Sequence, residues 1–259
     1  MAFQKFYLCA LFNIELTSRA LGKQFIILLV SFLILSHFAY SQSGKPGSWG
    51  IATIVLPVNT DHRWGGYVEA QVRTDEILFN KFFYYELKTG ISYAITNNAT
   101  ALIGTGRYDT YDYTDLDKGA ETKERRLWEQ MTFSQYLNRI KVEHRYRIEQ
   151  RWLNGNYRNR FRYRLNLVAP INHKDFSANT IFVSVFNEIF FNNKQPNFER
   201  NRVSASLGYQ LSSAIAVQAG WLNQYNILPS DVTNNKNNLI INFTYQISRR
   251  RKELPTIKD

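Results

Sequence analysis

Hydrophobic and polar positions alternate along most of the chain, and the alternation is clearest over residues 139–151. Charged residues occupy every odd position of this segment, whereas Ile140, Val142, Tyr146 and Ile148 occupy even positions. Because successive side chains of a strand point to opposite faces, the segment predicts a strand with one ionic face and one mostly apolar face. A helix would distribute the same charges around its whole circumference.

The next segment, residues 158–167, repeats this pattern. Arg158, Arg160, Arg162 and Arg164 share one face, and apolar and aromatic residues share the other. Basic residues interleaved with aromatic ones also occur on nucleic-acid-binding surfaces. The strict period of two and the export signal described below argue against that interpretation, so we predict no nucleic-acid partner.

Nine further segments show strand-like alternation, and their connections carry turn residues. They cover residues 49–56, 64–73, 82–95, 100–109, 124–136, 180–191, 200–211, 214–225 and 238–247. The pattern is weak over 100–109 and ambiguous over 124–136. The chain is therefore predicted to be all-β.

Residues 1–41 have the pattern of a secretory signal peptide with an unusually long n-region. Lys23 precedes an apolar stretch, and Ala39-Tyr40-Ser41 forms a small-x-small cleavage site, so cleavage is predicted before Gln42. The apolar stretch is shorter than the roughly 20 residues of a spanning helix, which argues against the alternative of a retained anchor. We predict a chain exported to the outer membrane of a Gram-negative bacterium.

The composition adds little beyond an excess of basic over acidic residues. Removal of the leader takes three of the 32 basic and one of the 21 acidic residues and leaves a net charge of +9. The single cysteine, Cys9, lies in the leader, so the mature chain has neither disulfides nor thiolate metal sites. Residues 249–259 form a basic tail that we expect in the periplasm.

An exported all-β chain that crosses a membrane must close into a barrel, because every backbone group has to be paired in lipid. We therefore predict an antiparallel up-and-down transmembrane β-barrel over residues 42–248. Eleven strands are visible, but single-chain bacterial barrels usually have an even number. We predict about 12 strands, with 10 as the alternative. A twelfth strand before Trp49, or a threaded N-terminus, would reconcile the eleven visible strands with a chain that starts in the periplasm.

The connections sort into two kinds, as in outer-membrane barrels. Residues 96–98, 137–138 and 212–213 form tight turns, whereas residues 109–123 and 226–236 are long and polar. The tight turns are expected in the periplasm and the long loops outside the cell. Aromatic residues near strand ends predict interfacial girdles. These residues are Trp64, Tyr93, Tyr136, Trp152, Tyr209 and Tyr245.

The ionic strand faces predict a charged lumen in which arginine outnumbers glutamate. The predicted set is Glu69, Arg73, Glu86, Lys88, Lys141, Glu143, Arg145, Arg147, Glu149, Arg151, Arg160, Arg162, Arg164, Glu188, Arg200 and Arg202. Two interpretations remain open: an interlocked salt-bridge network that fills the lumen, or a narrow anion-preferring passage. Either would be a monomeric barrel in contact with outer-membrane lipids and lipopolysaccharide, inserted by the barrel-assembly machinery.

The mature chain offers little catalytic chemistry, and no catalytic residue, metal ligand or cofactor is assigned. Its histidines are His62, His144 and His173. Catalysis needs a nucleophile within reach of a base. Pairing across the turn at 137–138 sets His144 opposite Met131 rather than Ser134. A membrane-embedded hydrolase or acyltransferase that modifies lipid or lipopolysaccharide is the alternative function.

Several short motifs resemble the domain of unknown function 2490 family of exported outer-membrane barrels. They are Trp49, Trp64 with Glu69, Gln71 and Arg73, the block 145–151, Arg160–Leu165, Asn187–Phe190, Asn201-Arg202, and Gly220-Trp221 followed by Gln224. The block Arg145-Tyr-Arg-Ile-Glu-Gln-Arg151 is the most specific. The resemblance implies a barrel of unknown activity and brings no catalytic residues with it.

Overall fold

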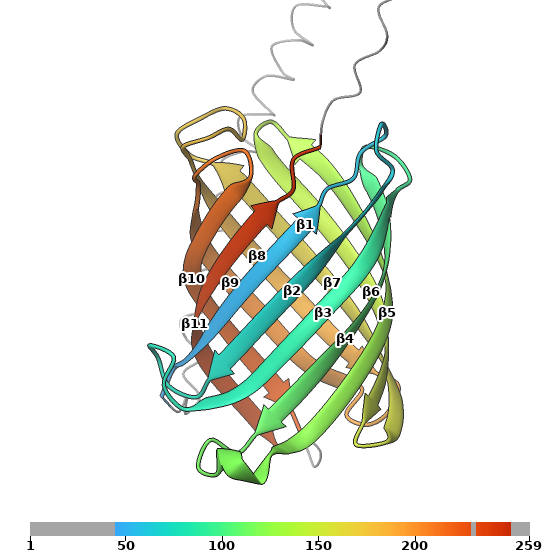
Figure 1. The fold of residues 1–259 in the computed structure, drawn as a ribbon, viewed down its shortest axis with the longest axis vertical. Coiled ribbons are helices and arrows are strands. Elements are labelled where there is room, and N and C mark those ends of the chain that lie inside the picture. The colour runs from blue at the N-terminus through green and yellow to red at the C-terminus, as the bar shows by residue number, and fades with distance from the viewer. Residues whose placement is uncertain (1–44, 229–231, 250–259) are drawn as a thin grey trace, which may run out of the picture. The chain divides into compact units, whose positions relative to one another are not determined.

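The computed structural model describes residues 45–228 and 232–249 and shows one closed β-barrel, as the all-β prediction requires (Figure 1). Its strands are β1 (Gly47–Leu56), β2 (Trp64–Thr74), β3 (Phe82–Ala94), β4 (Ala99–Tyr111), β5 (Ala120–Leu137), β6 (Ile140–Leu153), β7 (Asn156–Pro170), β8 (Thr180–Asn192), β9 (Phe198–Gln210), β10 (Ile215–Ile227) and β11 (Thr233–Gln246). A short 3-10 helix, η2 (Leu116–Lys118), lies between β4 and β5. The predicted signal peptide and the tail after Arg249 lie outside the described residues.

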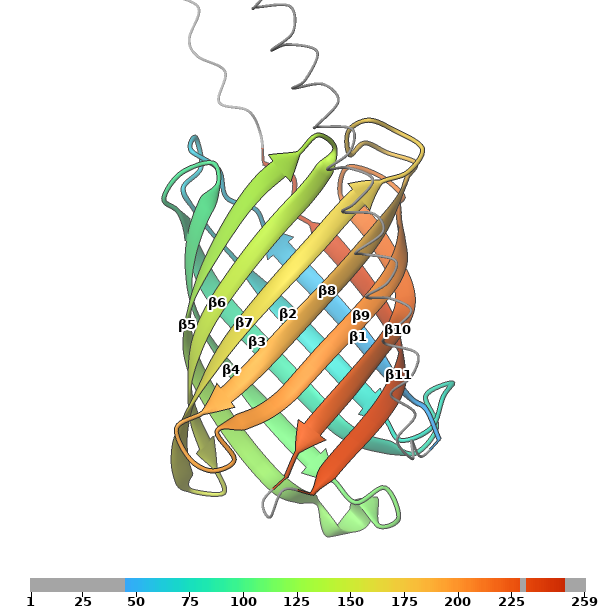
Figure 2. The same cartoon turned by 180° about the vertical axis from the view of Figure 1, so that it is seen from behind.

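Each strand pairs antiparallel with the next, and the strands run obliquely around the barrel (Figures 1 and 2). The ring closes between β1 and β11, which are parallel, from Gly47↔Asn238 to Val55↔Gln246. The barrel therefore has eleven strands, and both the prediction of twelve and the alternative of ten are wrong. In an odd ring the first and last strands point the same way, so closure needs one parallel pair. Both edges of β1 are occupied, so the ring has no place for another strand there.

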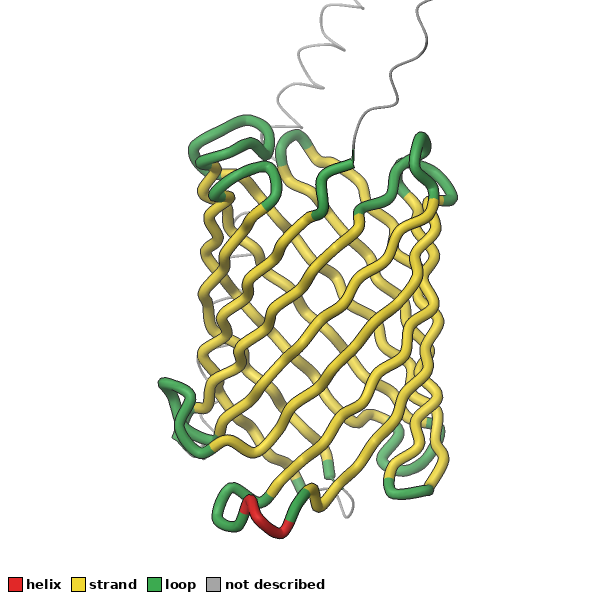
Figure 3. Tube along the Cα trace, viewed as in Figure 1, coloured by secondary structure: helices red, strands yellow, loops and turns green. Residues whose placement is uncertain are grey.

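The two mouths of the barrel differ less than the sequence suggests (Figure 3). We call the end where β1 begins the N-terminal mouth and the end where β11 finishes the C-terminal mouth. The expected loops 109–123 and 226–236 shorten to 112–119 and 228–232, because polar strand ends pair with each other, as in Thr110↔Thr122 and Asn226↔Asn234. The longest connection, 171–179, lies at the C-terminal mouth beside the predicted tight turns.

Two hairpin turns set the register of the ionic strands. Asn138 has a φ of 55°, and the turn Asn138-Arg139 makes Leu137 and Ile140 partners. Asn154 and Gly155 have φ of 46° and 86°, as a type I′ hairpin between β6 and β7 requires. This register places Phe133, not Met131, opposite His144, because the turn begins one residue later than predicted.

Interior glycines provide room for large aromatic rings that lie flat on the barrel wall. A Cβ atom at Gly104 would lie 2.4 Å from the indole of Trp128, and one at Gly208 would lie 2.2 Å from the ring of Phe182. Trp128 is fully buried. Aromatic rings that cover strand glycines help to fix register and curvature.

Burial is inverted relative to a water-soluble protein. Glu149 and Glu188 are 0% exposed, whereas Trp64 and Ile91 are 65% and 64% exposed. Alternation along the strands sends most of the charged residues inward and most of the large apolar residues outward. Within the described residues no helix has the length and hydropathy needed to span a bilayer.

Candidate functional site

The barrel encloses a polar cavity of about 1070 Å³ that is lined by inward-facing residues of all eleven strands. The wall extends from Asp75 and Asn234 near the N-terminal mouth to Asn97 and Ser134 near the C-terminal mouth. A second cavity of about 770 Å³ adjoins it at the C-terminal mouth and includes Phe176 and Ser177 of the 171–179 connection. The interior is therefore hollow over much of its length.

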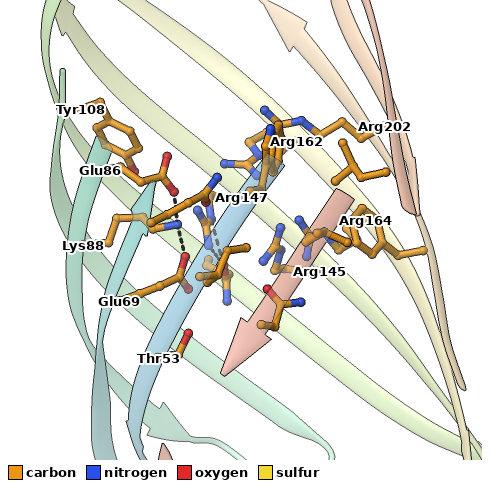
Figure 4. Close-up of a pocket in the computed structure, with 18 of the residues that line it drawn as sticks. Thr53, Glu69, Glu86, Lys88, Tyr108, Arg145, Arg147, Arg162, Arg164 and Arg202 are labelled. Carbon is orange, nitrogen blue, oxygen red and sulfur yellow. Dashed lines mark hydrogen bonds and ion pairs between the residues drawn. The ribbon is translucent and has the colours of Figure 1, made fainter. Parts of the chain in front are cut away.

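The structure brings the residues predicted from the ionic strand faces together inside the barrel (Figure 4). The wall residues are Glu69, Arg73, Glu86, Lys88, Lys141, Glu143, Arg145, Arg147, Arg151, Arg160, Arg162, Arg164, Arg200 and Arg202. The other two, Glu149 and Glu188, lie beneath arginine side chains and are fully buried. The set forms two separate networks and one isolated ion pair, Lys141–Glu143.

The larger network is centred on Glu188. Its Oε1 accepts hydrogen bonds from Arg145 Nη2 and Arg162 Nη2, both at 2.7 Å. Its Oε2 accepts one from Arg164 Nη2 at 2.7 Å, and Arg202 Nη1 lies 4.0 Å from the same oxygen. One carboxylate, on β8, thus serves four guanidinium groups on β6, β7 and β9.

Arg162 links Glu188 to a second carboxylate, Glu149. Arg162 Nη1 donates to Glu149 Oε1 at 2.5 Å, and Arg160 Nη2 donates to Glu149 Oε2 at 2.6 Å. Arg147 reaches Glu149 only at 3.6 Å, and its Nε and Nη2 instead donate to the amide oxygen of Gln130. Arg147 therefore has a weaker carboxylate contact than Arg160 and Arg162.

Three members of this network escaped the sequence prediction. Glu124 binds Arg126 through both oxygens, at 2.8 and 2.7 Å, and also accepts from Arg151. Trp128 faces inward and interrupts the ionic face of β5. The alternation pattern over residues 124–136 is therefore ambiguous. Glu199 accepts from Arg160 at 2.9 Å. A register shift between β8 and β9 turns Glu199 inward. Strict alternation would have placed Glu199 and its inward neighbour Arg200 on opposite faces, so the sequence pattern could not reveal this position.

The smaller network lies on β2 and β3 and is balanced in charge. Glu86 accepts from Arg73 at 3.2 Å and pairs with Lys88 at 2.5 Å, and Lys88 also pairs with Glu69. Over the described residues, the cavity wall carries thirteen basic and five acidic side chains, and Glu149, Glu188 and Glu199 beneath it raise the acids to eight. The positive excess therefore lies outside β2 and β3, mostly on β6 to β9.

Aromatic rings hold several of the guanidinium groups in place. Arg73 lies between Trp49 and Tyr84, 3.9 and 4.1 Å from the two ring centroids. Arg164 stacks on Phe186 at 4.2 Å. Such stacking favours the flat, weakly hydrated guanidinium group over an ammonium group.

Outward-facing His144 has one polar partner. Its Nδ1 lies 2.9 Å from the hydroxyl oxygen of Tyr163, and the two rings are stacked. Ser134 lies on the opposite face of the sheet and lines the cavity. His62 and His173 lie in connections, and His173 contacts Thr180 at 3.0 Å.

The described residues contain no group of histidine, cysteine or carboxylate side chains arranged to hold a metal ion. In the β4–β5 connection, Asp112 Oδ1 accepts from the backbone N–H of Thr114 at 2.8 Å and from its hydroxyl at 2.6 Å. This carboxylate therefore stabilises its own turn.

The six predicted girdle residues divide between the two mouths. Trp64, Tyr93, Tyr136, Tyr209 and Tyr245 lie at the C-terminal mouth, where Trp64 packs on Tyr93 with centroids 4.9 Å apart. Trp152 lies at the N-terminal mouth and packs on Tyr157 at 5.5 Å. Phe82, Tyr85 and Tyr111 join it there, as do Phe191 and Phe198.

These features define the class: an eleven-stranded β-barrel with an apolar exterior and an arginine-rich interior. The chain belongs to the DUF2490 family, whose description is protein of unknown function and whose model matches residues 46–249. The predicted family is thus confirmed. No curated protein matches the chain. Among solved structures, LpxR from Salmonella typhimurium matches with 10% identity and a TM-score of 0.37, over 66% of this chain and 80% of that one.

Proposed function

We propose that this protein is an outer-membrane β-barrel whose positively charged interior admits small anions. The observation that carries the proposal is the inverted distribution of side chains. A water-soluble protein rarely exposes a contiguous apolar patch larger than a few hundred Å². Here the outward positions on β8 to β11 form a continuous apolar row, as in Val183, Leu207, Ala219 and Ile241, and most large apolar side chains of the barrel are exposed. A bilayer is the solvent that such an exterior fits.

Polar residues on the outer face support an orientation with the N-terminal mouth outside the cell. On β10 and β11 the apolar outward run ends at Trp221, whose Nε1 donates to Asn237 at 3.1 Å. Beyond it, Asn223 donates to Asn235 and Asn237 at 2.7 and 2.9 Å. Such a polar ladder extends the strands past the hydrocarbon layer, as the extracellular side of such barrels does.

The anion preference rests on the excess of arginine along the cavity wall. A field of one sign inside a narrow, low-dielectric passage concentrates ions of opposite charge. Eleven strands lie between the filled eight-stranded barrels and the open porins with about 16 strands. The hollow interior favours the passage over the filled lumen.

The closed ring supports a monomer in outer-membrane lipid and lipopolysaccharide. No strand edge within the described barrel is free for pairing with a second chain. The alternating apolar residues Phe243 and Tyr245 of β11 and Ile247 just after it support insertion by the barrel-assembly machinery.

Membrane location and conduction can be tested separately. Detergent-extracted outer membrane should contain a folded form that migrates faster on a gel before boiling than after it. In planar bilayers across a salt gradient, the sign of the reversal potential should show anion preference. Arg145→Glu should move selectivity towards cations, whereas Arg63→Glu, in the exposed β1–β2 connection, should not.

Recovery of the protein in the soluble periplasmic fraction would contradict the membrane location. A folded barrel that never conducts would contradict the passage and leave the structural role.

A membrane-embedded lipid-modifying enzyme is a second candidate, and the His144–Tyr163 pair supports it. The imidazole lies 2.9 Å from a hydroxyl group on the outward face, as a base and a nucleophile would. If this pair is catalytic, strains that carry His144→Ala or Tyr163→Phe should have the same lipid profile as a strain that lacks the gene. An unchanged profile on deletion of the gene would exclude the enzyme.

A further inference from the structure

The register of β6 and β7 sets four arginine side chains in a two-by-two block on the cavity wall. Arg145 lies directly opposite Arg164, and Arg147 lies directly opposite Arg162. We call these four residues the arginine quartet, and all four line the cavity. Like charges directly opposite each other destabilise a β-ladder. The quartet therefore contains repulsion that a bound anion would relieve.

Protein carboxylates neutralise the quartet only in part. Its four charges share two carboxylates, Glu149 and Glu188, and both also serve other arginines. At least two positive charges thus remain without a protein counterion. The quartet can therefore accept an anion with two negative charges.

Several hydrogen-bond donors of the quartet have no protein partner among the described residues. A guanidinium group has five N–H donors. Arg145 uses one, to Glu188, and the two bonds of Arg147 both go to the neutral amide of Gln130. Arg164 donates through Nη2 alone, and its buried Nε has no hydrogen-bond partner. Arg162 donates through all three of its nitrogen atoms and holds the two carboxylates in place.

We propose that Arg145, Arg147 and Arg164 form a binding site for the dianionic phosphate group of a small soluble phosphate monoester. The forked geometry of arginine matches phosphate oxygens in paired hydrogen bonds, which chloride cannot form. A monoester carries close to two negative charges at neutral pH, because its second pKa is about 6. The cavity of about 1070 Å³ leaves room for the remainder of such a solute. This inference deepens the proposed anion passage by naming its substrate class.

The site can be tested on the purified barrel in detergent, where neither a membrane nor conduction is needed. Glycerol 3-phosphate binding would be measured by calorimetry at low and moderate salt. Arg147→Gln and Arg164→Gln should each weaken binding tenfold or more. Arg63→Gln removes the same charge outside the lumen and should change it less than twofold. Affinity should rise between pH 5 and 7.5, as the phosphate loses its second proton.

Arg147→Lys and Arg164→Lys keep the charge and lose the fork, so they test the site if the glutamine variants fail to fold. They should weaken binding at least threefold. Equal binding of chloride, or unchanged binding by the quartet variants, would overturn the site without touching the membrane location. A barrel that binds glycerol 3-phosphate but does not conduct would keep the site and overturn the passage. Binding of phosphatidate in nanodiscs in place of glycerol 3-phosphate would overturn the assignment to a soluble solute.

Discussion

Arg145 and Arg164 lie directly opposite each other on adjacent strands, and both donate a hydrogen bond to Glu188 at 2.7 Å. Two like charges thus face each other, and one carboxylate, from β8, binds both. The same register sets Glu188 opposite Arg202 on β9. Arg145, Arg164, Glu188 and Arg202 therefore form one row across β6 to β9, and Glu188 is its single acidic member.

Removal of the Glu188 charge should destabilise the barrel strongly. Glu188→Gln leaves four guanidinium groups around a neutral amide, and a broken buried ion pair costs about 3–5 kcal/mol. Unfolding in urea, followed by the gel migration of the folded form, measures the loss. Glu143→Gln is the matched control, because its partly exposed pair with Lys141 should contribute only about 0–1 kcal/mol. Equal effects of the two variants would contradict the central role of Glu188.

A larger side chain at Gly104 should disrupt the wall at Trp128. A Cβ atom there would lie 2.4 Å from the indole ring, so Gly104→Ala forces the ring away at a cost of about 1–3 kcal/mol. In a double-mutant cycle, Gly104→Ala should cost much less in a Trp128→Leu background. Additive effects would show that the two residues do not share this space.

An arginine on the outward face should interfere with membrane insertion. Leu207 is 56% exposed, and Val183 and Ala219 flank it on the neighbouring strands. Leu207→Arg should therefore cost about 2–4 kcal/mol in a bilayer. Leu116, 47% exposed in η2, is the control, because Leu116→Arg lies outside the barrel wall. Refolding yields into lipid vesicles compare the two, and equal yields would argue against a lipid-facing Leu207.

Parallel closure can be tested by cross-linking. Thr53 and Thr244 are direct partners across the β1–β11 seam and both line the cavity. A Thr53→Cys, Thr244→Cys double variant should be joined within one chain by a short bismaleimide. Cysteine at Thr53 and Ala216 should not be joined, because β11 lies between them. The reverse result would contradict the parallel seam.

The stability of the β2–β3 connection should fall at acid pH. Lys81 and Lys45 bind Glu76 at 2.9 and 3.1 Å, and they lower its pKa from 4.5 to about 2, mainly through the hydrogen bond from Lys81. A depressed carboxyl pKa stabilises the folded loop above pH 4.5, and this stabilisation is lost as the pH falls towards 2. An NMR titration of Glu76 should therefore show a low midpoint. Lys81→Met should move that midpoint towards 4.5, and an unshifted wild-type midpoint would contradict the ion pairs.

Local sequence determined the strands and the faces of most of them. A period of two in Arg145-Tyr-Arg-Ile-Glu-Gln-Arg is enough to separate charged from apolar positions, because the pleat sends neighbours to opposite sides. The turn Asn154-Gly155 likewise follows from residues that tolerate positive φ. These features depend on residues next to each other in the chain.

Tertiary structure decided the closure, the register and the charge partners. The parallel β1–β11 seam joins residues at opposite ends of the barrel sequence, and no local pattern encodes it. A shift of one residue at the turn Asn138-Arg139 changed the partner of His144, and a register shift brought Glu199 inward. Backbone hydrogen bonds between distant segments fix which side chains face each other. The arginine quartet therefore exists only once β6 and β7 are paired.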